Sequence, residues 1–112
     1  MSFEIITSDY FDAEAKVLAK RYKSFKKDLI EFRKELEKAP LQGSEIAPNI
    51  RKIRMAIATK GRGKSGGARI ITYNALVTEQ EGKVYLLLIY DKADASSVKM
   101  NVVKQIVKEL IG

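Results

Sequence analysis

The sequence contains neither cysteine nor histidine. Without cysteine the chain can form no disulfide, no thiolate zinc site and no cysteine nucleophile, and a reducing compartment is the expected location. Without histidine it lacks the commonest general base and the commonest metal ligand, so acid–base chemistry would depend on Lys, Arg, Tyr, Asp or Glu. We therefore expect no metal site and no small-molecule cofactor.

Long apolar runs are also missing. No stretch approaches the roughly 20 apolar residues that cross a bilayer, and residues 1–14 lack the basic and apolar regions of a secretion signal. We expect a cytoplasmic protein that does not associate with membranes. The 112 residues, of which 46% are hydrophobic, suit one domain spanning residues 1–112, large enough to bury a core without cross-links.

Acidic residues are absent from residues 46–78. This segment holds seven basic residues: Arg51, Lys52, Arg54, Lys60, Arg62, Lys64 and Arg69. The rest of the chain balances 14 basic against 14 acidic residues, so the whole formal charge of +7 belongs to this segment. Such a concentration of charge is typical of a surface that binds a polyanion such as RNA, whereas a basic loop kept only for solubility is the alternative.

Hydrophobic periodicity predicts the element order β-α-α-β-β-β-α. Residues 3–6 form a short strand, after which Ser8 or Asp9 caps one helix and Ser24 caps a second helix that follows almost without a loop. The apolar faces of this helical hairpin are expected to consist of Phe11, Ala15, Leu18, Tyr22, Phe25, Leu29, Phe32 and Leu36.

Three further strands are predicted within residues 50–58, 68–77 and 84–90. Ser96 or Ser97 then caps a closing helix that ends at Gly112. The apolar face of that helix is expected to contain Val98, Val102, Ile106 and Leu110. These elements give an α+β fold with a mostly antiparallel four-stranded sheet, whose helices cover one face and leave the other free for binding.

Residues 63–65, Gly-Lys-Ser, match the end of a phosphate-binding P-loop. The comparison fails because the first glycine of that motif falls at Ala58. It also fails because Gly66 and Gly67 lead into a β-branched strand, whereas a P-loop must open a helix. Nucleotide hydrolysis is therefore not expected.

Four of the cations can converge on one face of the sheet. Lys52 and Arg54 lie two residues apart on one strand face, and Lys64 and Arg69 follow on the next loop and strand. Arg69 can grip two phosphate oxygens, and we expect it to be held for phosphate and to be dispensable for folding. Repulsion among these cations favours the neutral form of a lysine, and a neutral lysine can act as general base on a ribose 2′-hydroxyl. The spacing therefore leaves both RNA cleavage and plain phosphate binding open.

The helical hairpin, the stretch IRKIRMAIATKGRGKSGGARIITY and the later VYLLLIYDKAD together resemble the RelE/ParE toxin superfamily in its HigB-like branch. The resemblance spans nearly the whole chain. Its most specific part is residues 63–70, which are similar to the GKSGGxR segment of that branch. It implies a RelE-like fold and a toxin of a type II toxin–antitoxin system, which cleaves messenger RNA in the ribosomal A site and is neutralised by a cognate antitoxin.

The resemblance also assigns residues by position. It implies a catalytic set that consists of Lys52, Arg54, Lys64, Arg69 and Lys92. Contacts to RNA or the ribosome are expected from Arg51, Lys60, Arg62, Tyr73 and Tyr90. Members closest to RelE place a tyrosine near the start of the last helix, which this chain lacks, so Tyr73 and Tyr90 are its candidates for base stacking. A tyrosine that ends an apolar strand is, however, more often part of the core.

Two alternatives to the ribonuclease stay open. ParE-like members of the superfamily inhibit DNA gyrase by binding a protein target, and we expect them to lack a convergent set of Lys and Arg side chains. A ribosome-binding or RNA-binding protein without catalysis is also consistent with the charges. The basic cluster favours the ribonuclease.

Overall fold

The computed structural model describes residues 2–78 and 80–111. Within these ranges the elements, in chain order, are β1 (Ser2–Thr7), α1 (Asp9–Arg21), α2 (Phe25–Lys38), β2 (Ser44–Ala47), β3 (Ile50–Met55), the short 3-10 helix η1 (Ala58–Lys60), β4 (Ala68–Thr78), β5 (Glu81–Asp91) and α3 (Met100–Ile111). No helix of the described chain has the length and apolar character needed to cross a membrane.

The five strands form one mixed sheet in the order β1-β5-β4-β3-β2. β1 runs parallel to β5, and the other neighbours are antiparallel. The predicted α+β class is confirmed, but the predicted four-stranded sheet was wrong. β2 escaped prediction because it is a short edge strand, largely exposed, and so lacks the alternation of a half-buried strand.

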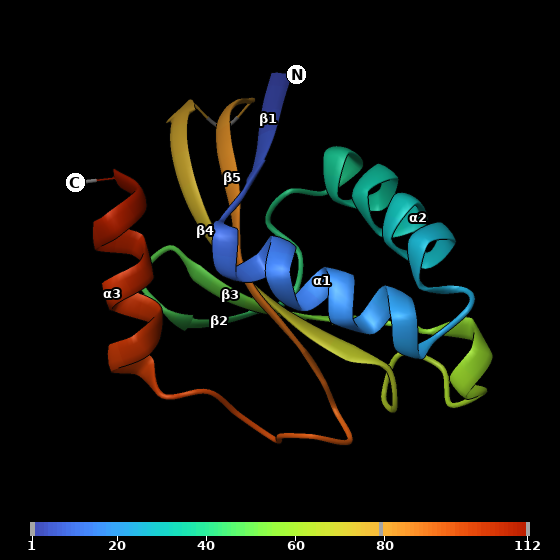
Figure 1. Ribbon diagram of the computed structural model, residues 1–112. Coiled ribbons are helices and arrows are strands. Elements are labelled where there is room, and N and C mark those ends of the chain that lie inside the picture. The colour runs from blue at the N-terminus through green and yellow to red at the C-terminus, as the bar shows by residue number, and fades with distance from the viewer. Residues whose placement is uncertain (1, 79, 112) are drawn as a thin grey trace.

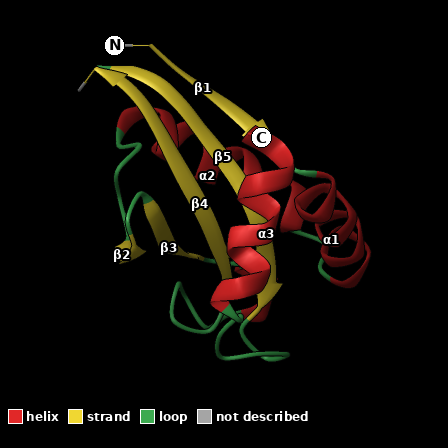
Figure 2. Ribbon diagram, turned by 90° about the vertical axis from the view of Figure 1, so that its left-hand side faces the viewer, coloured by secondary structure: helices red, strands yellow, loops and turns green. Residues whose placement is uncertain are grey.

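Helices cover both faces of the sheet (Figure 1). The predicted hairpin faces of α1 and α2 are confirmed: Phe11, Leu18, Phe25, Phe32 and Leu36 are buried against the sheet. α3 packs on the opposite face, where Val103 and Ile106 join a second core cluster (Figure 2). The prediction of a wholly free sheet face was therefore wrong, since a helix as apolar as α3 also needs a surface to cover.

Ser8 caps α1 as predicted. Its Oγ accepts a hydrogen bond from the backbone N–H of Phe11 at 3.0 Å and donates to the carbonyl of Leu87 at 2.6 Å, so the start of α1 is tied to β5. Ser24 occupies the predicted position before α2, but its Oγ donates to the carboxylate of Asp28 at 2.6 Å instead of accepting from a helix N–H.

α3 begins later than expected. Ser96 and Ser97 precede the helix by several residues, and the carbonyl of Lys99 accepts hydrogen bonds from the N–H groups of Val102 and Val103. The predicted buried face is confirmed at Val98, Ile106 and Leu110, which belong to the second core cluster or pack against it. It was wrong at Val102, which is 46% exposed, while its neighbour Val103 is fully buried. The predicted end at Gly112 lies outside the described residues.

An irregularity in the β4–β5 pairing changes which side chains face α3. Ile71 pairs with Leu88 and Thr72 with Leu86, which leaves Leu87 as an extra residue in β5. A bulge of this kind shifts the alternation of the strand. As a result Tyr85 and Tyr90, five positions apart, both face α3.

Candidate functional site

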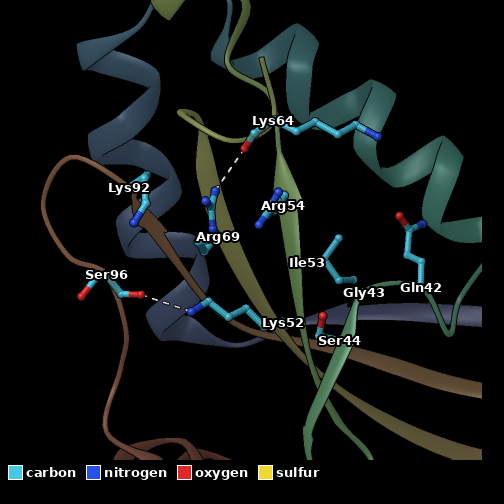
Figure 3. A pocket seen from close by; sticks show the side chains of 10 residues that line it. All are labelled: Gln42, Gly43, Ser44, Lys52, Ile53, Arg54, Lys64, Arg69, Lys92 and Ser96. Atoms are coloured by element: carbon cyan, nitrogen blue, oxygen red, sulfur yellow. Dashed lines mark hydrogen bonds between the residues drawn. The ribbon is translucent and has the colours of Figure 1, made fainter. Parts of the chain in front are cut away.

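An open cavity of about 480 Å³ lies on the face of the sheet that α3 partly covers, beside the segment that leads into that helix, and Figure 3 shows the side chains that line it. We call it the cationic cavity. It is lined by Gln42, Gly43, Ser44, Lys52, Ile53, Arg54, Lys64, Arg69, Lys92 and Ser96. All five residues predicted as catalytic are among them, and no acidic residue is found among the described residues of this lining.

Strand pairing brings the arginines together. Arg54 of β3 lies directly opposite Arg69 of β4, and residues opposite each other on antiparallel strands point to the same face. Lys52, two residues before Arg54, shares that face. Like charges in opposite positions are unfavourable without a counterion, so an anion bound between Arg54 and Arg69 would relieve their repulsion.

Arg69 is 6% exposed and holds the loop that precedes β4. One terminal nitrogen donates to the carbonyls of Lys64 at 3.1 Å and Ala68 at 3.2 Å, and the other donates to the carbonyl of Ser65 at 2.9 Å. The expectation that Arg69 is held only for phosphate and is dispensable for folding is thereby corrected. These three hydrogen bonds to the loop would be lost if Arg69 were replaced. Its Nε–H has no partner among the described residues and can still meet a ligand.

Lys52 and Arg54 differ in whether their side chains bond to other parts of the protein. The ammonium of Lys52 donates to the carbonyl of Ser96 at 3.2 Å and so connects β3 to the segment between β5 and α3 (Figure 3). Arg54 is exposed, and its guanidinium makes no hydrogen bond or ion pair with a described residue. Of the two, Arg54 is the readier to bind a ligand.

Lys64 and Lys92 flank the cavity from loops. The side chain of Lys64 runs from the loop toward α2, where Nζ lies 3.9 Å from Oε2 of Glu35 (Figure 3). Both side chains of this pair are more than half exposed, at 62% and 57%, and such pairs contribute about 0–1 kcal/mol, so the ammonium can leave Glu35 at little cost. Lys92 is fixed through its backbone, whose N–H donates to the carbonyl of Gly67 at 3.0 Å.

Lys60 does not join the cluster. Its ammonium is 2.5 Å from Oδ1 of Asp91, with side-chain exposures of 9% for Lys60 and 0% for Asp91, and it lies 5.5 Å from the centre of the Tyr22 ring. Burial in this ion pair removes it from the surface that RNA can reach. Its expected contact with RNA or the ribosome is therefore not supported by its position.

The carboxylate of Asp91 is the centre of a buried network that was not predicted from the sequence. The Tyr22 hydroxyl donates to Oδ2 at 2.5 Å and Arg21 donates to the same oxygen at 3.1 Å. Burial alone would raise the pKa of Asp91, but hydrogen bonds from Lys60, Tyr22, the Ala93 N–H and Arg21 outweigh it and hold that pKa well below its ordinary range. The only sequence signal was an aspartate at the end of a buried strand.

The remaining predicted contacts lie apart from the cavity. Arg51 pairs with Thr72 and faces the opposite side of the sheet from Lys52. Arg62 is exposed on the loop but does not line the cavity. Tyr73 packs near α3, with its ring 6.3 Å from that of Tyr85. Tyr90 is 9% exposed and lies in the core cluster beneath α3, next to a second and smaller cavity.

Three polar lining residues were not predicted as part of the site: Gln42, Ser44 and Ser96. Gln42 and Ser44 flank Gly43, which has a φ of +89° and lies so close to β3 that an added Cβ would be 2.6 Å from the Lys52 carbonyl oxygen. Both features require glycine, and that glycine was the available signal that this loop packs onto β3. The rejection of a P-loop is confirmed, since residues 61–66 form turns that lead into strand β4.

No known protein-family model matches the chain. The described residues hold no group of three or more His, Cys, Asp or Glu side chains that could bind a metal ion. What the site offers is a concave, cationic surface with polar side chains at its edge. Such a surface suits a phosphodiester ligand.

Proposed function

We propose that this protein is an RNA-cleaving toxin of a type II toxin–antitoxin system, belonging to the HigB-like branch of the RelE/ParE superfamily. In this proposal it acts in the cytoplasm on messenger RNA in the ribosomal A site. The observation that carries the proposal is the pairing of Arg54 with Arg69 in a cavity whose described lining contains no acidic residue. The two arginines are separated in sequence and face one another only in the folded chain.

The cavity supplies the groups that cleavage of RNA requires. A base removes the proton of the ribose 2′-hydroxyl, the oxygen attacks phosphorus, and the 5′-oxygen leaves with a proton, which yields a 2′,3′-cyclic phosphate and a 5′-hydroxyl. Arg54 and the free Nε–H of Arg69 are placed to neutralise charge on the phosphoryl oxygens. Because no carboxylate was found in the lining, the proton carriers in this proposal are lysines. Lys52 and Lys92 are the candidates, since the side chain of Lys64 runs toward Glu35 of α2 (Figure 3).

Two macromolecular partners follow from the same proposal. A ribosome presents RNA phosphates, and the exposed Arg62 on the loop is positioned to contact them outside the cavity. A cognate antitoxin would neutralise the toxin, and a cationic surface of this kind complements an acidic protein segment.

Arg54→Ala is the sharpest test, because Arg54 makes no bond with the described residues whose loss would disturb the fold. After induction, the 5′ ends of ribosome-bound transcripts are mapped. The wild type is expected to produce cuts in phase with codons and to arrest growth, whereas Arg54→Ala should lose both. Arg33→Ala, which removes an equal charge from the exposed face of α2, is the matched control and should remain toxic.

Other results would redirect the assignment. Growth arrest with gyrase-trapped DNA breaks and intact transcripts would indicate a ParE-like inhibitor. A toxic Arg54→Ala variant that still cuts transcripts would contradict the proposed site.

A non-catalytic RNA-binding protein is the second candidate. It is favoured by the hydrogen bonds that commit Arg69 and Lys52 to backbone carbonyls, which give both residues a structural role without catalysis. Binding to ribosomes that depends on Arg54 but leaves every transcript intact would support this candidate.

A further inference from the structure

Asp91 and Lys92 are consecutive residues whose side chains lie on opposite sides of the sheet. The Asp91 carboxylate lies on the side of the helical hairpin, where Tyr22 and Arg21 of α1 donate to it. Lys92 lies on the other side, in the lining of the cationic cavity (Figure 3). Successive side chains of an extended chain point to opposite faces, which accounts for this arrangement. The buried network and the cavity are therefore separated by a single peptide bond.

Both peptide groups that flank the Cα of Lys92 are hydrogen-bonded. The N–H of Lys92 donates to the carbonyl of Gly67 at 3.0 Å, which extends the pairing of β4 with β5 by one residue. The N–H of Ala93 donates to Oδ1 of Asp91 at 3.0 Å, which is the bond of an Asx turn. Because the peptide on each side is held, the backbone of Lys92 has little freedom and the direction of its Cα–Cβ bond is fixed.

The backbone of Asp91 bonds the same turn. Its carbonyl accepts from the N–H of Asp94 at 3.0 Å and from that of Ala95 at 3.3 Å. Arg21 donates to the carboxylate of Asp91 at 3.1 Å and to that of Asp94 at 2.8 Å, and so ties the turn to α1. Asp91 thus holds the turn with its side chain and its carbonyl, while α1 and Lys60 hold the Asp91 carboxylate.

The side chain of Lys92 depends on this backbone support. A lysine carries its ammonium on a flexible four-carbon stem, which would sweep a large volume if the backbone beneath it were free. The ammonium of Lys52 is held by the carbonyl of Ser96, but no bond to the ammonium of Lys92 is found among the described residues. The turn is therefore what directs Lys92 toward the cavity.

We propose that Asp91 is a positioning residue, whose carboxylate holds the turn that directs Lys92 toward the phosphate of an RNA in the cationic cavity. The inference rests on the proposed function, which supplies the RNA. Residues behind a site commonly act in this way, by fixing the geometry of the residue that meets the ligand. Asp91 does not meet the ligand itself, because its side chain is completely buried on the hairpin side.

Three variants that share Lys60→Met separate positioning from stability. Removing Lys60 first ensures that no ammonium is left buried without its counter-charge when Asp91 is changed. Lys60→Met keeps the Asp91 carboxylate, Lys60→Met/Asp91→Ala removes the acceptor of the Ala93 N–H, and Lys60→Met/Asp91→Asn restores an oxygen to it. Binding of a fluorescein-labelled single-stranded RNA is followed by anisotropy while the salt concentration is varied.

The slope of log affinity against log salt concentration is the measured quantity. It should be smaller by about 0.7 in Lys60→Met/Asp91→Ala than in Lys60→Met, because one cation no longer meets a phosphate. It should recover in Lys60→Met/Asp91→Asn, although the amide does not restore the charge of the network. Adding Lys92→Ala to Lys60→Met/Asp91→Ala should reduce the slope no further, because Lys92 is the cation that was displaced.

The remaining outcomes would overturn the inference in distinguishable ways. If Lys60→Met/Asp91→Ala keeps the full slope while Lys92→Ala alone reduces it, Asp91 does not position Lys92 and the proposed function stands. A slope that Asp91→Asn does not restore, or that falls again when Lys92→Ala is added, would show that Asp91 only stabilises the cavity as a whole. If Lys92→Ala alone leaves the slope unchanged, Lys92 does not meet phosphate, and its part in the proposed function fails as well.

The wild type gives a reading that requires no variant. The backbone amide of Ala93 should be protected from hydrogen exchange, because it is bonded to a carboxylate that the hairpin holds in place. An unprotected Ala93 amide would show that Asp91 does not hold the turn.

Discussion

Lys60 and Asp91 form a buried ion pair, although Lys60 belongs to the most basic segment of the chain and was expected at its surface. Nζ and Oδ1 are 2.5 Å apart, and the Asp91 side chain is completely buried. The pair joins η1 to the end of β5, and Tyr22 and Arg21 add the end of α1 to the same carboxylate. It therefore fixes the loop from which Lys64 reaches the cationic cavity.

Asp91→Asn should lower the free energy of unfolding by about 3–5 kcal/mol, because it leaves the Lys60 ammonium buried without its counter-charge. Lys60→Met should cost less, since Tyr22 and Arg21 still bond the Asp91 carboxylate. Urea denaturation measures both. Glu37→Gln, on the exposed face of α2, is the charge-matched control and should stay within about 0.5 kcal/mol of the wild type. An Asp91→Asn variant as stable as this control would contradict the role of the pair.

The same network predicts how stability depends on pH. The pKa of Asp91 is held below its ordinary range in the folded protein, whereas an aspartate in the unfolded chain has a pKa of about 3.9. The stabilisation is therefore fully present above the unfolded value and is lost as the pH falls from there through the folded pKa. The difference in unfolding free energy between the wild type and Asp91→Asn should be constant from about pH 6 to 8 and shrink in acid below about pH 4. A difference that grew in acid would have the wrong sign.

Arg69→Ala and Arg54→Ala should differ in stability although both should lose function. Removing the Arg69 guanidinium leaves the carbonyls of Lys64 and Ser65 without their donors, and we expect a cost of about 1–3 kcal/mol together with faster amide hydrogen exchange in residues 61–67. Arg54→Ala should change neither quantity. Unchanged exchange in the Arg69→Ala variant would show that the loop is held by other contacts.

Gly67 permits the loop to lie against the end of β3. A Cβ at this position would collide with the carbonyl oxygen of Met55, and backbone cannot move aside as a side chain can. Gly67→Ala should therefore destabilise the protein by about 1–3 kcal/mol and displace Lys92, whose N–H bonds the Gly67 carbonyl. Gly61→Ala, at a φ of +67° but in open space, measures the cost of a left-handed backbone conformation without any collision and should be the milder variant in thermal unfolding.

RNA binding should weaken with salt in proportion to the number of cations that contact phosphate. For single-stranded RNA, each contact contributes about 0.7 to the slope of log affinity against log salt concentration. Arg54→Ala and Lys92→Ala should each reduce the slope by about this amount, as measured by fluorescence anisotropy with a short RNA. Lys60→Met should leave it unchanged because Lys60 is buried with Asp91. A reduced slope for Lys60→Met would mean that the ion pair opens when RNA binds.

Strand alternation explains which parts of the site were predictable from sequence. Lys52 and Arg54 had to share a face, and the antiparallel pairing of two consecutive strands brought Arg69 to the same face. The direction of a long exposed side chain follows no such rule, and the turn of Lys64 toward Glu35 could not be predicted. The burial of Lys60 could not be predicted from the sequence either, because its partner Asp91 is distant in sequence.

The helices likewise combine features that follow from local sequence patterns with features that depend on contacts distant in sequence. The faces of α1 and α2 follow from periodicity because both helices lie on a broad sheet surface that buries their whole apolar stripe. Most of the buried face of α3 also followed from the spacing, but the start of the helix depends on the path of residues 92–99. That segment is fixed by a contact distant in sequence, between Lys52 and Ser96, which no local pattern encodes.

The position of β5 between β1 and β4 has a consequence for biosynthesis. Until residues 81–91 have emerged from the ribosome, the N-terminal strand lacks its parallel partner and β4 lacks one neighbour. The cationic cavity is completed later still, because Lys92 and Ser96 follow β5. A nascent chain can therefore display every cation of residues 46–78 without having assembled the cavity. Residues 1–96 must therefore all be synthesised before the site can exist.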